Sequence, residues 1–556
     1  MTDRVEAEGS SSSLLSSSRM MAAGTIVSRL TGFLRAGLLA AAIGVSLHAE
    51  VFNVANTIPN SVYILVAGGV FNAVLVPQLV RAAKTDADGG DNYANRIITL
   101  GAVVLAGVTA VLVLAAPVLL QLFVDRSFFT DPALAAQRES LIDFTRWCLP
   151  QIFFYGMFVL IGQILNARGR FGPMMWAPIA NNLIAIAVIV VYLVAYGGQA
   201  ARGGYTTSQE LLLGLGSTLG IVAQTLLLMP YLRAAGFSVR PRFDFRGTGL
   251  GHTLRLGMWT VGFVIVNQLA FYVMVHRATA GTAEVVRGDS DASGYTVYSN
   301  AFLLTQVPHS IITVSLATAA MPLLSRLAAD HRLSEVSAEI TSTLRLVLSV
   351  IVPCAVALLV LGTPMSTVLF SWGAASGETA ALGETLMAFS IGMLMFSVHY
   401  LVLRGFYALE DTRTPFFIQC LVAAVNIVCA IGLTMAVDPR LVAPALALAY
   451  GASYTVGAAV SFTVLSRRLR STSSRTLATF VLRVVVAGAA AGAVTWLCLQ
   501  GLEAAGLDDS HKPDSLALLG LGGLTGMVCY LGMARLLGVS EIARILGLMQ
   551  TRGKRG

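Results

Sequence analysis

The sequence predicts an all-α polytopic membrane protein with about 14 transmembrane helices, and three observations lead to this fold class. Apolar residues make up 56% of the 556 residues, charged residues make up 12%, and the mean hydropathy is +0.75. Soluble domains carry about 25% charged residues, so this composition cannot cover a water-exposed surface. In addition, the loops between apolar segments alternate in basic charge, and several motifs occur twice along the chain.

The predicted spans are segments of about 20 predominantly apolar residues. Spans two, eight and nine are long and contain proline or glycine, which membrane helices tolerate where neighbouring helices or a wet cavity satisfy the backbone. In chain order, the spans lie at residues 20–45, 50–80, 97–124, 143–166, 174–196, 210–234, 251–277, 295–325, 340–371, 379–407, 415–436, 441–465, 477–500 and 515–538.

Basic residues are concentrated in every second loop, whereas the intervening loops, such as Glu503–Asp514, carry several acids. By the positive-inside rule the basic loops are cytoplasmic, and an even number of spans then places both termini in the cytoplasm. The basic residues of these loops are Arg81, Lys84, Arg96, Arg168, Arg170, Arg233, Arg240, Arg242, Arg246, Arg326, Arg332, Arg404, Arg413, Arg467, Arg468, Arg470 and Arg475.

Two motifs recur at nearly the same offset. "VPQLVRAA" and "MPLLSRLA" place Arg81 and Arg326 245 residues apart, and "ILNARGRFGP" and "GFYALEDTRTP" place Pro173 and Pro415 242 residues apart. These matches predict two parallel six-helix lobes around a central cavity, with the substrate site between them. The predicted domains are a disordered cytoplasmic tail (1–18), an N-terminal lobe (19–235), a C-terminal lobe (236–470), two further helices (471–541) and a basic cytoplasmic tail (542–556).

The first span contains two arginines in the stretch "VSRLTGFLR". Arg29 lies near the start of the span and could reach the inner interface, whereas Arg35 lies about 9 residues, or about 14 Å, from the start of the apolar core near Ile26, close to the middle of the membrane. An intramembrane arginine marks a functional site by default, and forked guanidinium donors suit a phosphate or diphosphate. The alternative is an intramembrane salt bridge, for which Glu50 is the nearest acid in sequence.

Further polar residues occur in spans one, two, seven and eight. Each of them alone is more often an interhelical hydrogen bond than a ligand, but together they mark a polar path between the two lobes. With the arginines, the candidate substrate-binding residues are Arg29, Arg35, Glu50, Asn53, Asn56, Asn267, Gln268, Asn300 and Gln306.

The sequence contains no catalytic or nucleotide-binding motif and no cluster of metal ligands, so it predicts a protein that is not an enzyme and has no cofactor. The six cysteines lie in or beside apolar runs, which is typical of buried free thiols. The net charge of +8 reflects the loops and gives no indication of nucleic-acid binding.

Five segments of the sequence are characteristic when taken together: Ser28–Arg35, Ile58–Leu79, Ile164–Asn182, Ala320–Ala328 and Gly405–Pro415. In these segments the chain resembles the lipid II flippases, the MurJ/MviN group of the multidrug/oligosaccharidyl-lipid/polysaccharide exporter superfamily. The order and spacing of the segments match across roughly residues 19–470.

The resemblance implies fourteen helices in two six-helix lobes plus two, and a function in moving an undecaprenyl-diphosphate-linked glycopeptide by alternating access. The two first-helix arginines of the family fall on Arg29 and Arg35, and a second-helix acid falls on Glu50. Charged positions of the family fall here on Ala36, Tyr63, Phe302 and Leu303, so this site is less cationic. The family has a sodium site that involves the seventh helix, but the corresponding segment of this sequence, Leu254–His276, contains no acid.

The sequence therefore predicts a lipid II flippase of the bacterial plasma membrane that acts in peptidoglycan synthesis and binds lipid II and membrane lipids. Cell-wall synthases and divisome or elongasome proteins are further candidate partners. Two alternatives are a polysaccharide-lipid or drug exporter of the same superfamily and a non-transporting membrane scaffold for cell-wall synthesis. A scaffold would not need Arg35 in mid-membrane, and an exporter of cationic drugs would need an acidic cavity.

Overall fold

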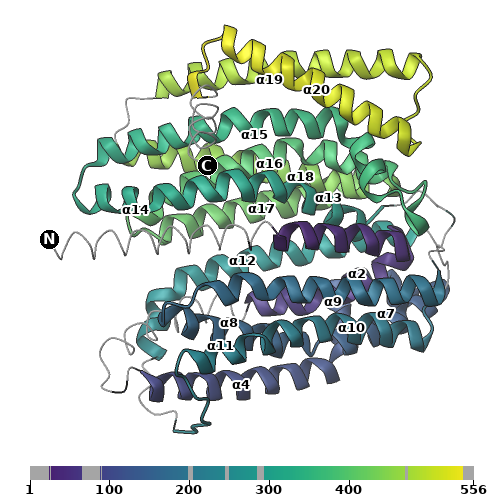
Figure 1. Cartoon of the computed structure of the whole chain (residues 1–556), viewed down its shortest axis with the longest axis vertical. Coiled ribbons are helices and arrows are strands. Elements are labelled where there is room, and N and C mark those ends of the chain that lie inside the picture. The colour runs from purple at the N-terminus through teal and green to yellow at the C-terminus, as the bar shows by residue number, and fades with distance from the viewer. Residues whose placement is uncertain are drawn as a thin grey trace. The chain divides into compact units, whose positions relative to one another are not determined.

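A computed structural model of the chain describes residues 24, 27–65, 88, 90–197, 204–244, 250–284, 288, 293–469 and 474–541. All regular elements among these residues are helices (Figure 1), which confirms the all-α prediction. The chain divides into two compact units, one ending at Gln268 and the other beginning at Leu269. Helix α12 (Leu250–Ala283) contains this boundary.

Twelve helical stretches in the described residues are long and apolar enough to cross a membrane, and they coincide with predicted spans three to fourteen. Predicted spans one and two lie partly outside the described residues, as does the motif Val76–Ala83, and the tails 1–18 and 542–556 lie wholly outside them. The count of fourteen, the two repeated lobes and the predicted domain ranges therefore stay predictions.

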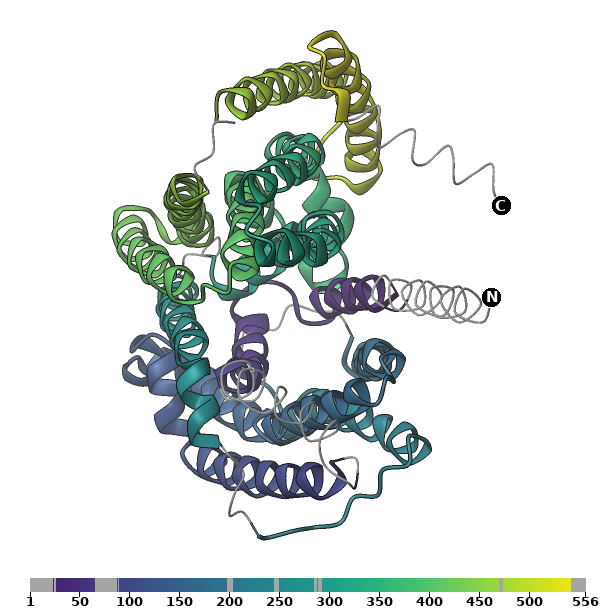
Figure 2. The ribbon, with the colours of Figure 1, turned by 90° about the vertical axis from the view of Figure 1, so that its left-hand side faces the viewer.

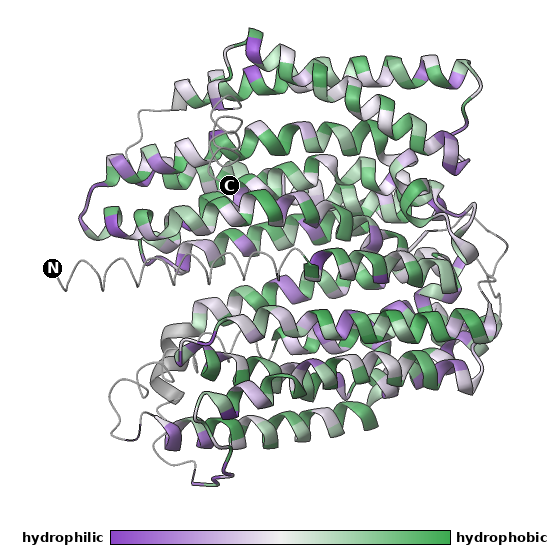
Figure 3. Cartoon of the chain, in the orientation of Figure 1, coloured by the Kyte–Doolittle hydropathy of each residue, from purple (hydrophilic) through white to green (hydrophobic). Residues whose placement is uncertain are grey.

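Large apolar side chains are exposed along the spans, as in a protein whose solvent is lipid. Leu114, Val194 and Leu536 are 83%, 84% and 81% exposed. Hydrophobic residues run along most of each helix, whereas hydrophilic residues gather at helix ends and connections (Figure 3). The chain is a multi-pass membrane protein.

In the described part of the N-terminal unit, residues 27–43 are helical, and a short break around Gly44 separates them from α2. Helix α9 begins with a glycine–proline pair, and the proline fixes a backbone angle suited to the first helical turn. The helices after the first are α2 (Leu47–Tyr63), α4 (Asp91–Leu114), α5 (Ala116–Phe123), α6 (Ser127–Thr130), α7 (Ala135–Cys148), α8 (Gln151–Ala167), α9 (Gly172–Tyr196), α10 (Thr207–Leu226), α11 (Leu228–Ala234) and the first part of α12.

Helix α10 packs closely because it presents glycines to its neighbours. A Cβ atom added at Gly216 would lie 2.6 Å from the Val188 side chain of α9, so any larger residue would force the two helices or this side chain to shift. Tyr205, just before α10, stacks on His48 with ring centroids 3.7 Å apart and donates a 2.8 Å hydrogen bond to the His48 carbonyl. These contacts fix the first turn of α2, the helix that carries Glu50 and the candidate asparagines.

The C-terminal unit has α16 at its centre, in contact with α13, α15 and α18. Its helices are the last part of α12, α13 (Tyr295–Pro308), α14 (Ser315–Ala329), α15 (Leu333–Phe370), α16 (Ala380–Ala408), α17 (Arg413–Ala436), α18 (Val442–Arg468), α19 (Ser474–Ala504) and α20 (Lys512–Leu536). A π-helical turn, His309–Val314, joins α13 to α14 directly after Pro308. The proline cannot donate a backbone hydrogen bond, and the wider turn accommodates this loss.

The last two helices form a hairpin beside α15 (Figure 2). The Tyr530 hydroxyl of α20 donates a 2.7 Å hydrogen bond to the Ser349 carbonyl of α15. On the other side of the hairpin, a Cβ atom at Gly488 of α19 would lie 2.9 Å from Val352. A hydrogen bond and a close backbone approach thus hold the hairpin against α15 within the C-terminal unit.

Candidate functional site

The helix at residues 27–43, which carries both candidate arginines, is hydrogen-bonded to α9. The Asn182 amide donates to the Ser28 carbonyl and to the Thr31 hydroxyl, each at 3.0 Å. A Cβ atom at Gly32, one residue further on, would lie 3.5 Å from the same amide, in ordinary van der Waals contact. A buried amide that makes two hydrogen bonds fixes the rotation of the helix just before Arg35.

Arg29 is exposed and Arg35 is half-buried. Arg35 lies within electrostatic range of the Tyr155 phenol of α8. Tyr155 in turn stacks on Tyr63 of α2, with ring centroids 5.2 Å apart. Among the described residues Arg35 forms no ion pair with an acid, so the alternative salt bridge with Glu50 is not observed.

The α2 candidates lie on a helix that is packed from several sides. Glu50 is 1% exposed and Asn53 is half-buried. The Asn56 side-chain oxygen accepts a 3.1 Å hydrogen bond from Gln151 of α8. Gln151 and Tyr155 are four residues apart on α8, so one face of this helix contacts both Asn56 and the Arg35–Tyr63 region.

The two α12 candidates differ in their surroundings. Gln268 is 4% exposed and donates a 2.8 Å hydrogen bond to the Ser61 carbonyl of α2, whereas its neighbour Asn267 is exposed. Ser61 lies two residues after Pro59, where α2 lacks one backbone donor. Gln268 thus ties α12 to α2 within the N-terminal unit.

Asn300 and Gln306 belong to the C-terminal unit, where both are half-buried on α13. Between them, Phe302 occupies a position that is charged in the resembled family and packs with Phe389 and Tyr450 at centroid distances of 5.7 and 5.6 Å. The predicted loss of charge at this position is therefore accompanied by an aromatic cluster, which Tyr298 completes.

The site list drawn from the sequence omitted Gln151, Tyr155 and Asn182. In the sequence these residues are only three isolated polar side chains in two strongly apolar helices, which is a weak indication of a site. The structure also shows that the Nε of Arg277 on α12 donates a 2.8 Å hydrogen bond to Thr434 of α17. Over the described part of the chain, no group of three or more His, Cys, Asp or Glu residues could hold a metal ion.

The fold and the arginine-bearing first helix define a multi-pass transporter. The family model described as "Lipid II flippase MurJ" matches residues 39–511. The chain belongs to the lipid II flippase MurJ family. A probable lipid II flippase MurJ of Rhizobium meliloti is 27% identical over 528 residues, which cover 94% of this chain and 93% of that protein.

Two solved structures have the same fold. A lipid II flippase MurJ in an inward closed conformation has a TM-score of 0.69 at 17% identity and covers 95% of this chain and 99% of its own. An inward-facing multidrug resistance MATE family transporter of the MOP superfamily has a TM-score of 0.61 at 15% identity and covers 80% of this chain and 96% of its own. The fold is thus shared by a flippase and a drug exporter, so the fold alone does not distinguish their substrates.

Proposed function

We propose that this protein moves lipid II, the undecaprenyl-diphosphate-linked peptidoglycan precursor, from the inner to the outer leaflet of the bacterial plasma membrane by alternating access. Family membership over residues 39–511 supports the substrate class. The fold shared with an inward closed flippase and an inward-facing exporter supports alternating access.

The observation that carries the proposal is the environment of Arg35. The residue is half-buried in an apolar helix, and its electrostatic neighbour among the described residues is a neutral phenol. Burying a guanidinium in the membrane without a carboxylate partner costs free energy unless an anion binds to it. Forked donors can replace part of the hydration that a diphosphate loses in the membrane.

We assign the diphosphate to Arg29 and Arg35, and gating or contacts with the sugar and peptide to Glu50, Asn53, Asn56, Asn267, Gln268, Asn300 and Gln306. Asn56 and Gln268 also tie helices together, so substitutions at these two positions carry a packing cost in addition to any loss of binding. The proposal includes cytoplasmic termini, no enzymatic activity and cell-wall synthesis proteins as partners.

The test is a leaflet-resolved lipid II assay in cells depleted of their own flippase. Expression of this protein should restore lipid II in the outer leaflet and growth, and Arg35→Ala at equal membrane levels should restore neither. Restored growth without outward movement of lipid II would favour the scaffold. Export of cationic drugs without lipid II movement would favour an exporter of the same superfamily.

A further inference from the structure

The segment at residues 235–244 follows α11 on the side of the basic loops, begins with a turn and then runs without regular secondary structure along α4. We call these residues the strap. Its sequence, "AGFSVRPRFD", combines aromatic and basic residues with one acid. None of the functions proposed above uses this segment.

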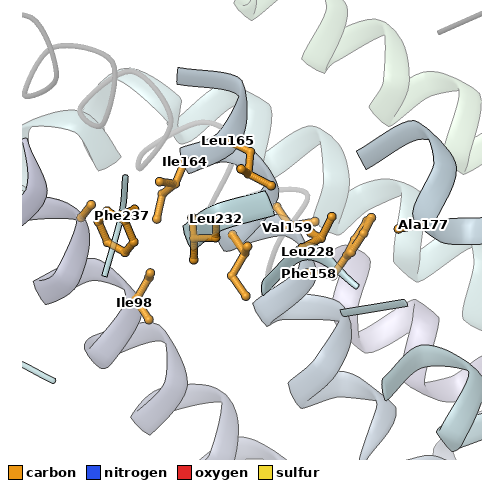
Figure 4. Packing of buried hydrophobic residues seen from close by; sticks show 11 residues of the cluster. Ile98, Phe158, Val159, Ile164, Leu165, Ala177, Leu228, Leu232 and Phe237 are labelled. Atoms are coloured by element: carbon orange, nitrogen blue, oxygen red, sulfur yellow. The ribbon is translucent and has the colours of Figure 1, made fainter. Parts of the chain in front are cut away.

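Phe237 anchors the strap in the core of the N-terminal unit. It is 1% exposed and packs in an apolar cluster with Ile98 of α4, Ile164 of α8 and Leu232 of α11 (Figure 4). The Arg168 guanidinium lies over its ring, 5.0 Å from the centroid, and also donates a 2.8 Å hydrogen bond to the Ala235 carbonyl. The start of the strap is therefore fixed.

The main chain of the strap is held along α4. The Asn95 amide donates to the Ser238 carbonyl at 3.3 Å, and its oxygen accepts from the Arg240 N–H at 2.7 Å. One turn further along α4, the Thr99 hydroxyl accepts from the Arg242 N–H at 2.9 Å. Because these bonds use backbone atoms of the strap, the side chains of Arg240 and Arg242 are not needed to hold it.

Those two side chains and a large aromatic ring face outward. Arg240 is exposed, Arg242 is half-buried, and Phe243 is 69% exposed. Val103, one turn beyond Thr99 on the same face of α4, is 52% exposed and begins the lipid-facing surface of that helix. Phe243 directly follows Arg242, whose N–H is bonded to Thr99 one turn before this apolar surface of α4 begins.

Among the described residues at this end of the unit are three acids, and two of them are paired with arginines. Asp91 pairs with Arg168, and Asp244 pairs with Arg96, whose hydrogen bond lowers the pKa of the Asp244 carboxyl. Arg242 is within electrostatic range of Asp244 and of the third acid, Asp88. Basic residues still outnumber these acids: Arg96, Arg168, Arg170, Arg233, Arg240 and Arg242.

We propose that the strap is a binding site for anionic phospholipids of the cytoplasmic leaflet. Arg240 and Arg242 contact the lipid phosphate, and Phe243 inserts beside Val103 at the boundary of the acyl chains. Arginine favours phosphate because it donates forked hydrogen bonds, and each basic residue at an anionic surface strengthens binding about fivefold. This inference does not depend on lipid II being the substrate.

The test uses the full-length protein in detergent micelles that contain equal amounts of phosphatidylglycerol and phosphatidylethanolamine. Intact-complex mass spectrometry counts the lipids of each kind that remain bound. Wild-type protein should retain phosphatidylglycerol preferentially, and R240Q/R242Q should lower this preference at least about fivefold. Phe243→Ser should weaken retention of both lipids, because it removes the apolar contact that they share.

The matched control is R332Q/R467Q, which removes the same charge from two exposed arginines of the C-terminal unit. It should leave the preference unchanged, and an equal loss in this control would overturn the strap as a specific site. An unchanged preference in R240Q/R242Q would also overturn it. Inorganic phosphate at millimolar concentration should not displace the lipid, and displacement would indicate a site for soluble anions instead.

The attachment of the strap to α4 is tested separately by Asn95→Ala, which should lower the preference for phosphatidylglycerol without changing any charge.

Discussion

Asn182 on α9 donates two hydrogen bonds of 3.0 Å to the first helix, at Ser28 and Thr31. The Asn182 side chain thus contacts the first helix one turn before Arg35, and these hydrogen bonds set the rotation of that helix against α9. A residue 154 positions away in sequence from Ser28 thus helps position the proposed diphosphate ligands.

Asn182→Ala should lower both the thermal stability of the purified protein and its lipid II movement. Each lost hydrogen bond costs about 0.5–1.5 kcal/mol, and the helix that carries Arg35 becomes free to rotate. Thermal unfolding in detergent measures the first effect and the leaflet assay the second. Asn426→Ala is the control, since its amide makes one hydrogen bond of 3.5 Å, to Ser453. Equal stability and equal transport in both variants would show that the Asn182 hydrogen bonds do not position the first helix.

Arg35→Ala should abolish rescue of a flippase-depleted strain, and Arg35→Lys should be impaired, because an ammonium supplies charge without the planar fork. Arg29→Ala should be less severe, since Arg29 is exposed. Growth at matched membrane levels and lipid II binding by intact-complex mass spectrometry are the measurements. If Arg35 were a structural partner of Glu50, the double change Arg35→Ala with Glu50→Ala would regain function. Normal binding by Arg35→Ala alone would exclude Arg35 as a substrate ligand.

Tyr63→Ala should destabilise the N-terminal unit, because it removes the ring that stacks on Tyr155, and such pairs contribute about 0.5–1.5 kcal/mol beyond area burial. Tyr63→Phe keeps the ring and should unfold at the wild-type temperature. A comparison of the three unfolding temperatures tests the stacking. A fall for Tyr63→Phe as large as that for Tyr63→Ala would mean that the hydroxyl, not the ring, is the stabilising group.

The alternating basic loops predict that the loop Glu503–Asp514 is outside the cell and that the connection between α14 and α15 is inside. Ser510 lies in the first of these places and Ser334 in the first turn of α15, beside the second, and both are exposed, so both tolerate cysteine. A membrane-impermeant thiol reagent should label Ser510→Cys in intact cells and Ser334→Cys only after lysis. The native thiols, which are buried or half-buried, set the background in unsubstituted protein. The reverse labelling pattern would invert the topology.

The sequence by itself determined the membrane class and the positions of spans three to fourteen. Hydropathy is a property of about 20 consecutive residues, so it can be read without knowing which helices touch. The family was equally accessible, because its motifs are short, local and ordered along the chain. The two arginines were conspicuous for the same reason: a charge within an apolar run departs from its immediate neighbours.

Only the tertiary structure decided what surrounds those residues. Asn182 meets Ser28, Tyr155 meets Tyr63 and Asn95 meets the strap across large separations in sequence. A single Asn or Tyr in an apolar helix looks the same in sequence whether it pairs with a neighbouring helix or faces lipid headgroups. The difference arises from helix rotation and register, which the packing of whole helices fixes and no short stretch of sequence encodes.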